Sequence, residues 1–244
     1  MVDLFEKLEA DRGPLGQYEH LAHGYYTFPK LTGEIGSRMT FNGKEMIIWS
    51  LNSYLGLANH PEIRKVDEEA ARDWGLAYPM GARIMSGESA YHEQLENELA
   101  EFVQKDAGLL LNFGFQGILS IVDTLLSRRD VVVYDKDCHA CIYDGIRMHM
   151  GKRLPFEHND LESFDQQMKK AKLFAEKTNG GILVITEGVF GMRGEQGILK
   201  EIVEYKDKYQ FRLLVDDAHG FGTLGATGAG AGEEIEDTDV GKDA

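Results

Sequence analysis

The sequence lacks any long hydrophobic run and any secretion signal. No stretch approaches the roughly 18 consecutive apolar residues that a membrane-spanning helix needs, so no transmembrane segment is expected. The N-terminus, MVDLFEKLEADRG, is charged and has no apolar stretch of the kind that a signal peptide carries. We therefore expect a cytoplasmic protein.

Cysteine is nearly absent. The two that occur, Cys138 and Cys141, form a single C-x-x-C with His139 between them. Such a pair can be a redox centre or half of a metal site. No second ligand pair accompanies it in the sequence, so the metal interpretation is the weaker one, and we expect no bound metal.

Basic residues are few relative to acidic ones. The chain has 26 Lys and Arg against 41 Asp and Glu, which gives a formal net charge of −15. This charge repels phosphate backbones and anionic lipids, so neither nucleic acid nor a membrane surface is an expected partner. A small anionic ligand is still compatible with the sequence, because backbone N–H groups can hold it locally.

The rest of the composition is that of a globular protein with one large domain. Hydrophobic residues make up 43% of the 244 residues, and no internal repeat or low-complexity linker is present. We expect an N-terminal arm over residues 1–45, a large domain over 46–232 and an acidic tail over 233–244. The tail contains no strand pattern, so we expect that the fold is cut off there and that a C-terminal small domain is absent.

Short apolar runs alternate with helical patterns from Met46 onward. The expected strands are Met46–Leu51, Leu109–Leu111, Val131–Tyr134, Ile182–Thr186 and Arg212–Val215. The expected helices are Pro61–Trp74, Tyr91–Lys105, Gln116–Leu126, Leu161–Lys177 and Leu199–Tyr209. This alternation predicts an α/β fold with a mostly parallel sheet and helices on both faces. Ligands of such sheets bind beyond the carboxyl ends of the strands, so the residues that follow each strand are the candidates for a site.

Two acidic residues and a histidine follow the strand Arg212–Val215. Asp216 suits a turn or a helix cap, which is the commoner use of aspartate at such a place. The functional alternative is that Asp216 faces the protonated pyridine nitrogen of pyridoxal 5′-phosphate (PLP) and so keeps the ring electron-withdrawing. His219, three residues on, then reaches the phenolic oxygen of the same ring.

Three further strand ends carry candidate residues. His139 follows Val131–Tyr134, where an imidazole can stack on a flat ring and relay a proton. Gly114 and Phe115 open a helix after Leu109–Leu111, which is the outline of a phosphate cradle. Glu187 follows Ile182–Thr186 and either supports His139 and the ring or serves as an ordinary cap.

These motifs together resemble the α-oxoamine synthases, a family of PLP enzymes that includes serine palmitoyltransferase, 8-amino-7-oxononanoate synthase and glycine C-acetyltransferase. The matching stretches run in order through the chain: Asn52–Leu57, Gly81–Gly87, His92–Glu96, Gly114–Gln116, Asp137–Ala140, Asp144–Gly145, Glu187–Phe190, Val215–Gly220, Gly222–Gly225 and Gly228–Gly230. The resemblance implies PLP-dependent transferase fold type I with an incomplete large domain, and a homodimer.

The resemblance also assigns roles to the candidate residues. It implies His139 stacked on the ring, Asp216 at the pyridine nitrogen and His219 at the phenolic oxygen. It places backbone groups of Gly114 and Phe115 at the phosphate. It also places Asn52 and Arg83 beside the substrate, partly from a neighbouring subunit.

The sequence departs from the family pattern in several places. Ile118 stands where the family usually has Asn, and Gly191 where it usually has Ser. The lysine that binds PLP covalently and the arginine of the small domain have no counterpart. Lys242 is the only lysine after His219 and lies in the acidic tail, so we expect this chain as given to be inactive.

The resemblance implies an enzyme that condenses an amino acid with an acyl-CoA or acyl carrier protein and releases CO₂. Serine is the first expectation for the amino acid, with the biotin-pathway synthase or another amino acid such as cysteate as runners-up. Two alternatives of another class are an aminotransferase of the same fold and a non-catalytic partner subunit. His139 disfavours the first, because aminotransferases usually stack an aromatic ring there, and the intact set of His139, Asp216 and His219 disfavours the second.

Overall fold

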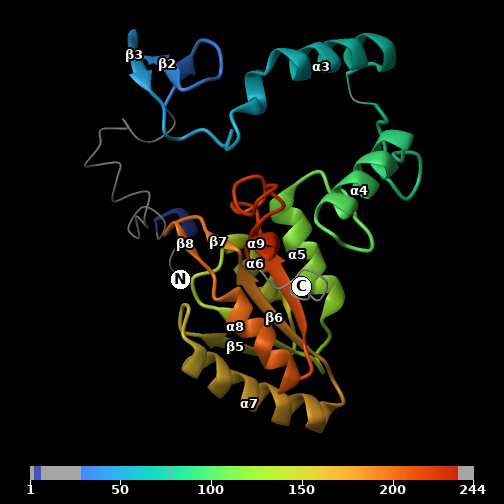
Figure 1. The fold of residues 1–244 in the computed structure, drawn as a ribbon, viewed down its shortest axis with the longest axis vertical. Coiled ribbons are helices and arrows are strands. Elements are labelled where there is room, and N and C mark those ends of the chain that lie inside the picture. The colour runs from blue at the N-terminus through green and yellow to red at the C-terminus, as the bar shows by residue number, and fades with distance from the viewer. Residues whose placement is uncertain (1–2, 7–28, 77, 236–244) are drawn as a thin grey trace. The chain divides into compact units, whose positions relative to one another are not determined.

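The chain divides into two compact units in a computed structural model that describes residues 3–6, 29–76 and 78–235 (Figure 1). The N-terminal unit is Met1–Tyr78 and the sheet unit is Pro79–Ala244. The predicted assignment of an arm, a large domain and a tail stays a prediction, and the expected acidic tail, Lys242 included, lies almost wholly outside the described residues. Among the residues described, no helix is long and apolar enough to cross a membrane.

The N-terminal unit contains a small antiparallel sheet. Its strands are β1 (Leu31–Thr32), β2 (Arg38–Phe41) and β3 (Lys44–Ile47). Asn42 and Gly43 connect β2 to β3 with φ angles of 48° and 74°, the left-handed conformations that a two-residue hairpin turn demands. The short helix η1 (Leu57–Asn59) and α3 (Pro61–Trp74) follow, and α3 begins at Pro61 as expected.

The expected buried strand Met46–Leu51 is wrong in two respects. The strand ends at Ile47, and all four residues of β3 are exposed. The physical reason is the Asn42–Gly43 turn, which folds β3 back on β2 in an antiparallel pair and leaves it outside the parallel sheet.

The sheet unit is built on four parallel strands. They are β4 (Val131–Asp135), β5 (Lys152–Phe156), β6 (Ile182–Glu187) and β9 (Arg212–Asp216), in the order β5-β4-β6-β9. This confirms the predicted parallel sheet. The sequence did not reveal β5, because only Leu154 and Phe156 are buried in it and Pro155 interrupts it, which an edge strand tolerates.

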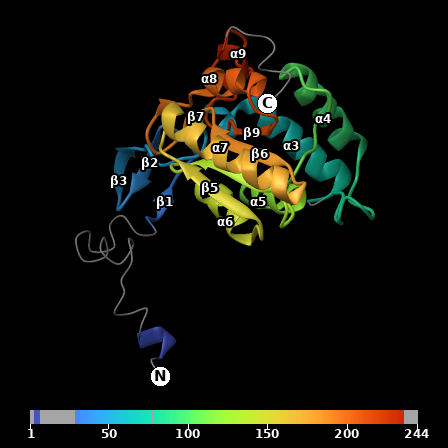
Figure 2. The same cartoon turned by 90° about the horizontal axis from the view of Figure 1, so that it is seen from below.

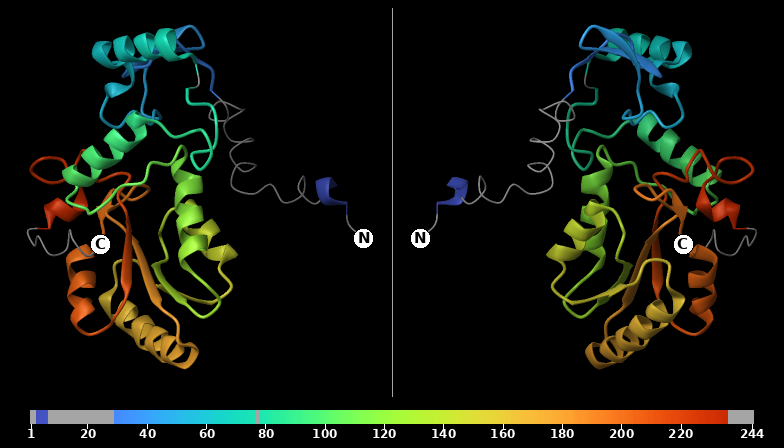
Figure 3. Two further views of the ribbon diagram at one scale, coloured as in Figure 1. Left: turned by 90° about the vertical axis from the view of Figure 1, so that its right-hand side faces the viewer. Right: turned by 90° about the vertical axis from the view of Figure 1, so that its left-hand side faces the viewer.

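Helices cover both faces of this sheet (Figure 3). Two of them, α5 (Gly114–Leu125) and α6 (Ala140–Met148), lie on one face, and α7 (Leu161–Thr178) and α8 (Leu199–Glu204) lie on the other. Figure 2 shows α6 and α8 on opposite sides of the strands. The remaining elements are α4 (Ala90–Phe102), the hairpin β7 (Val189–Phe190) and β8 (Glu195–Gln196), η2 (Tyr205–Asp207) and α9 (Ala231–Glu234).

The expected strand Leu109–Leu111 is also wrong. The backbone groups of its central residue, Leu110, are bound by side chains, whereas in a strand they would bond to a neighbouring strand. The Leu110 N–H donates to Glu96 Oε1 at 2.6 Å, and the Leu110 carbonyl accepts from Arg83 Nη1 at 2.8 Å. Because these backbone groups are already used, the segment enters α5 as an extended connection outside the sheet.

Successive residues of the parallel strands feed two separate cores. In β4, Val131 and Val133 pack with α7 and α8, whereas Val132 packs with α5 and α6. The first core is dominated by Phe164 of α7, which is fully buried and makes edge-to-face contacts with Phe156 at 5.2 Å and with neighbouring aromatic rings. Sheet strands covered on both faces read as continuous apolar runs, which is why β4, β6 and β9 are visible in the sequence.

We predict that Phe164→Ala lowers the free energy of unfolding by about 3–5 kcal/mol, because it removes a buried ring and leaves a cavity among its aromatic neighbours. The matched control is Leu173→Ala on the same helix, whose side chain is 69% exposed and should change stability by less than about 0.5 kcal/mol. Urea titration followed by circular dichroism measures both. Equal losses for the two variants would contradict this account of the core.

Candidate functional site

Two carboxylates emerge side by side at the carboxyl end of the parallel sheet. Glu187 ends β6 and Asp216 ends β9, and the strand register pairs them directly. In-register residues of neighbouring strands point to the same face of a sheet. The strand end of β4 leads on the same edge to His139 at the start of α6, so three of the predicted residues come together here.

Glu187 is buried and holds two backbone segments. Its Oε1 accepts a hydrogen bond from the His139 N–H at 2.5 Å, and the carboxylate also accepts from the N–H of Gly191 in the β7–β8 hairpin. Burial raises the pKa of Glu187 to about 7, and the nearby Asp216 and Asp135 carboxylates act in the same direction. The sequence left open whether Glu187 supports His139 or caps a turn, and the geometry shows that it supports the His139 backbone.

His139 caps the N-terminus of α6 with its own ring. Its Nδ1 accepts a hydrogen bond from the Cys141 N–H at 3.3 Å, and Cys141 Sγ lies 3.0 Å from the same nitrogen. A neutral imidazole that accepts at Nδ1 carries its proton at Nε2. The Phe115 ring stands edge-on to the imidazole, with 6.1 Å between ring centroids, and so connects the start of α5 to this place.

Asp216 is partly buried beside the thiol of Cys141. Its Oδ1 accepts from the Ala218 N–H at 3.2 Å, and its Oδ2 lies 4.0 Å from Cys141 Sγ. Burial, with the Asp216 charge second, raises the pKa of the Cys141 thiol to about 11. Burial likewise raises the pKa of Cys138. Both cysteines are therefore neutral thiols that pack beneath the site, which makes them poor redox or metal groups.

No group of three or more histidine, cysteine or acidic side chains in the described part of the chain is arranged to hold a metal ion. The C-x-x-C thiols are both buried and unbonded to each other.

His219 lies against the β7–β8 hairpin. A Cβ atom placed on Gly191 would come within 2.3 Å of His219 Nε2, so the imidazole fills the space in which a side chain at position 191 would lie. The hairpin is itself tied to the β4 end, because Arg193 Nη2 lies 2.5 Å from Asp137 Oδ2. Neither Gly191 nor Arg193 was found from the sequence as part of the site.

The N-terminus of α5 faces open space. No side chain caps this 12-residue helix, and a Cβ atom on Gly114 would meet no other atom within 4 Å. The first-turn N–H groups and the positive end of the helix dipole thus have room for an anion. The contact between Phe115 and His139 puts this helix end beside the other site residues.

Arg83 and Asn52 were predicted at the substrate. The structure places the Arg83 guanidinium against Glu96 at 2.5 Å and Glu88 at 2.6 Å, as well as on the Leu110 carbonyl. The hydrogen bond from Arg83, with that from the Leu110 N–H second, lowers the pKa of Glu96 to about 2, and these contacts fix the segment that leads into α5. Asn52 is an exposed residue of the N-terminal unit. For both residues the role at the substrate stays a prediction.

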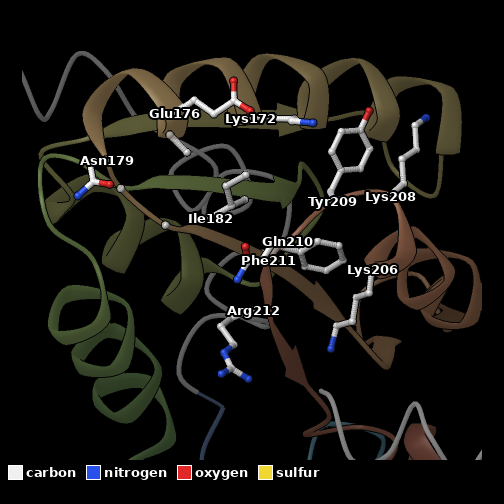
Figure 4. Close-up of a pocket in the computed structure, with 13 residues that line it drawn as sticks. Lys172, Glu176, Asn179, Ile182, Lys206, Lys208, Tyr209, Gln210, Phe211 and Arg212 are labelled. Atoms are coloured by element: carbon white, nitrogen blue, oxygen red, sulfur yellow. The ribbon is translucent and has the colours of Figure 1, made fainter.

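The sheet unit has a cavity of about 830 Å³ at the amino ends of its strands, away from the candidate site. Figure 4 shows it between the C-terminal half of α7 and the amino ends of β6 and β9. Its lining includes Lys172, Lys206 and Arg212, and none of the predicted site residues. Size alone therefore does not identify the site, since parallel sheets bind ligands at the carboxyl ends of their strands.

Residues 44–240 match the aminotransferase class I and II family. The chain belongs to this family. A cysteate-C-fatty acyltransferase from Capnocytophaga ochracea is 62% identical over 232 residues, which are 95% of this chain and 55% of that protein. An 8-amino-7-oxononanoate synthase from Petrotoga mobilis is 35% identical and covers 87% of this chain and 53% of its own length.

Solved structures agree with this assignment. Serine palmitoyltransferase from Sphingomonas wittichii superimposes with a TM-score of 0.83 at 27% identity and covers 96% of this chain and 58% of its own. An 8-amino-7-oxononanoate synthase from Francisella tularensis gives a TM-score of 0.61 at 26% identity, over 77% of this chain and 50% of its own. The chain spans about half the length of the curated relatives it matches. The resemblance to the α-oxoamine synthases and the PLP-dependent transferase fold are thereby confirmed.

We predict that Glu187→Gln removes a pH-dependent loss of stability. The folded chain binds this proton more tightly than the unfolded chain, since the pKa rises from 4.5 to about 7. The resulting stabilisation is complete below the lower value and disappears as the pH rises through the upper one. Between about pH 5 and about pH 8 the wild-type chain should lose about 2–3 kcal/mol relative to the variant.

Urea unfolding at several pH values measures this difference. The control is Glu201→Gln in the first turn of α8, a glutamate whose side chain is not part of the site. If the wild-type chain and Glu187→Gln have parallel pH profiles, the raised pKa of Glu187 is wrong.

Proposed function

We propose that the protein to which this chain belongs is a PLP-dependent C-acyltransferase. It condenses an amino acid with an acyl thioester, and the observation that carries the proposal is the set of groups at the carboxyl end of the sheet. A carboxylate, an imidazole and an open helix N-terminus lie together there. A ligand that carries a cationic ring at one end and a phosphate at the other needs such groups: the carboxylate for the cation and the helix N-terminus for the phosphate.

The residues present fit the cofactor. Asp216 would hold a proton at the pyridine nitrogen, and the N–H groups at Gly114 and Phe115 would bind the phosphate. His139 offers a flat ring on which the cofactor would stack, and His219 would serve the phenolic oxygen. When bound, PLP supplies an electron-withdrawing ring that stabilises negative charge at the amino-acid Cα.

The reaction forms one carbon–carbon bond. The amino-acid Cα loses its proton and attacks the thioester carbonyl, and the thiolate leaves and takes up a proton. The amino-acid carboxyl group then departs as CO₂, and Cα regains a proton. The His139 imidazole, whose Nδ1 faces the α6 cap and leaves Nε2 for the ligand, is suited to hold or deliver that proton.

We propose cysteate as the amino acid and a fatty acyl thioester as its partner. The support is the 62% identity to a cysteate-C-fatty acyltransferase, against 35% to an 8-amino-7-oxononanoate synthase and 27% to serine palmitoyltransferase. Cysteate, which was one of the alternatives expected from the sequence, thus replaces serine as the proposed substrate. We also propose, by resemblance to the α-oxoamine synthases, that the protein is a homodimer, and we propose the cytoplasm as its location.

We predict that Asp216→Asn leaves PLP bound to the full-length protein but lowers turnover on the order of 100-fold, because the ring nitrogen loses the charge that keeps it protonated. Asp123→Asn, an exposed carboxylate on α5, is the matched control and should retain wild-type turnover. The visible spectrum reports PLP binding, and CoA release reports turnover. Wild-type turnover in Asp216→Asn would remove Asp216 from the mechanism.

The identity of the amino acid is tested by comparing three substrates. The full-length protein is given a fatty acyl-CoA with cysteate, serine or alanine, and CoA release is measured for each. Cysteate should give the highest kcat/KM, by at least about tenfold, because groups placed to bind a sulfonate would be left unpaired when serine takes its place. A preference for serine would reject the cysteate assignment while leaving the C-acyltransferase intact.

A further inference from the structure

One imidazole outside the residues assigned to the cofactor touches three elements at the carboxyl end of the sheet. His158 follows β5, and its Nδ1 lies 3.0 and 3.1 Å from the two oxygens of Asp135, the last residue of β4. Its Nε2 lies 3.1 Å from Oε2 of Glu195 in β8. The ring also packs edge-to-face against Phe190 of β7, with 4.4 Å between ring centroids. His158 therefore joins β4 to both strands of the β7–β8 hairpin.

The two carboxylates set the number of protons on this ring. A neutral imidazole carries one N–H, so one of its nitrogens would present a lone pair to a carboxylate oxygen. An imidazolium has a donor at each nitrogen and satisfies both Asp135 and Glu195. Burial by itself lowers the pKa of His158, but the hydrogen bonds to Asp135 and Glu195 outweigh it and raise that pKa above the ordinary histidine value.

The other charges near His158 are paired with one another. Asp137, whose negative charge also raises the pKa of His158, has its Oδ2 2.5 Å from Arg193 Nη2 of the hairpin. Glu157, the residue before His158, pairs with Lys136. Within the described residues, the ring nitrogens thus bond only the two carboxylates of β4 and β8.

The two carboxylates differ in how much they depend on the ring. Asp135 is fully buried, whereas the Glu195 side chain is 54% exposed and can be hydrated. A buried carboxylate needs its donors more than a hydrated one does. When the ring loses one proton, the proton that remains should therefore stay at Nδ1 on Asp135. Nε2 then faces Glu195 without a donor, and this contact is the one that breaks.

The hairpin that His158 holds carries backbone groups of the candidate site. The Gly191 N–H donates to Glu187, which also accepts from the His139 N–H. The Gly188 N–H, at the start of the hairpin, donates to the Asp216 carbonyl at 2.9 Å. The place of the hairpin therefore affects the strand ends that carry Glu187 and Asp216.

We propose that His158 is an imidazolium in the folded protein and a positioning residue that holds the β7–β8 hairpin against the sheet edge. Its two N–H groups bond Asp135 and Glu195, and loss of the Nε2 proton loosens β8. These contacts are a property of the protein without PLP. Only their effect on PLP binding rests on the proposed function.

Nitrogen-15 NMR of the imidazoles in the full-length protein without PLP counts the protons on His158, whose signals His158→Gln identifies by their loss. The ring should lose its second proton at a higher pH than an ordinary histidine, whose pKa is about 6.5. Glu195→Gln should lower this pKa, because it removes one of the two carboxylates. The control is Glu176→Gln, an exposed glutamate in the C-terminal part of α7, which should leave it unchanged. A His158 pKa at or below the ordinary value, or one that Glu195→Gln does not move, would overturn the proposal.

Hydrogen exchange measures the effect on the hairpin. The Gly197 N–H, just after β8, donates to the Gly188 carbonyl at 3.0 Å. After correction for the intrinsic effect of pH on exchange, its protection should fall severalfold as the pH rises through the His158 pKa, since the stabilisation is complete below the ordinary pKa and lost above the raised one. Glu195→Gln should remove this dependence, because its amide can donate to the neutral ring. Protection that does not change with pH, or that changes equally in Glu195→Gln, contradicts the proposal.

PLP binding by the full-length protein tests the link to the site. His158→Gln should raise the Kd for PLP about tenfold at pH 6, the value of one hydrogen bond to a charged group, and this ratio should shrink as the pH rises through the His158 pKa. A ratio that is the same at every pH would mean general damage to the fold and would reject the positioning role. If the wild-type protein binds no PLP, the proposed function fails, while the NMR and exchange results still decide the state of His158.

Discussion

The direct pairing of Glu187 with Asp216 is the constraint on which the rest of the site depends. Because β6 and β9 are parallel and in register, their last residues emerge together at one edge of the sheet. Glu187 is buried there and accepts hydrogen bonds from backbone N–H groups on two other segments, the start of α6 and the β7–β8 hairpin. A single carboxylate therefore joins the segments that carry His139 and Gly191 to the strand next to Asp216.

The charges of this site are separated along its length. At the sheet edge, burial raises the pKa of Glu187 and of the Cys141 thiol, and the negative charge of the neighbouring carboxylates acts in the same direction. At the start of α5 the helix dipole and the uncapped N–H groups give the opposite polarity. A cationic ring with a phosphate on one side matches both ends, although the chain as a whole carries a charge of −15.

The sequence predicted those parts of the fold in which local pattern and tertiary environment agree. The strands β4 and β6 are buried on both faces, β9 is partly buried, and all three appear as apolar runs. The rule of carboxyl strand ends then led to His139, Glu187 and Asp216. The prediction from the sequence failed where side chains bind backbone groups that a strand would use for its own hydrogen bonds. Leu109–Leu111 looks like a strand, but Arg83 and Glu96 bind the Leu110 backbone, and neither residue is near it in sequence.

Several contacts that the sequence could not reveal join a side chain to a backbone. Glu187 binds the N–H groups of His139 and Gly191, which any residue at those positions would also offer. These two hydrogen bonds to Glu187 therefore do not depend on which side chains stand at positions 139 and 191. An imidazole at 139 and the absence of a side chain at 191 are consequently free to be set by the ring-binding chemistry. The same sheet edge can keep its architecture while these two positions change what the site does.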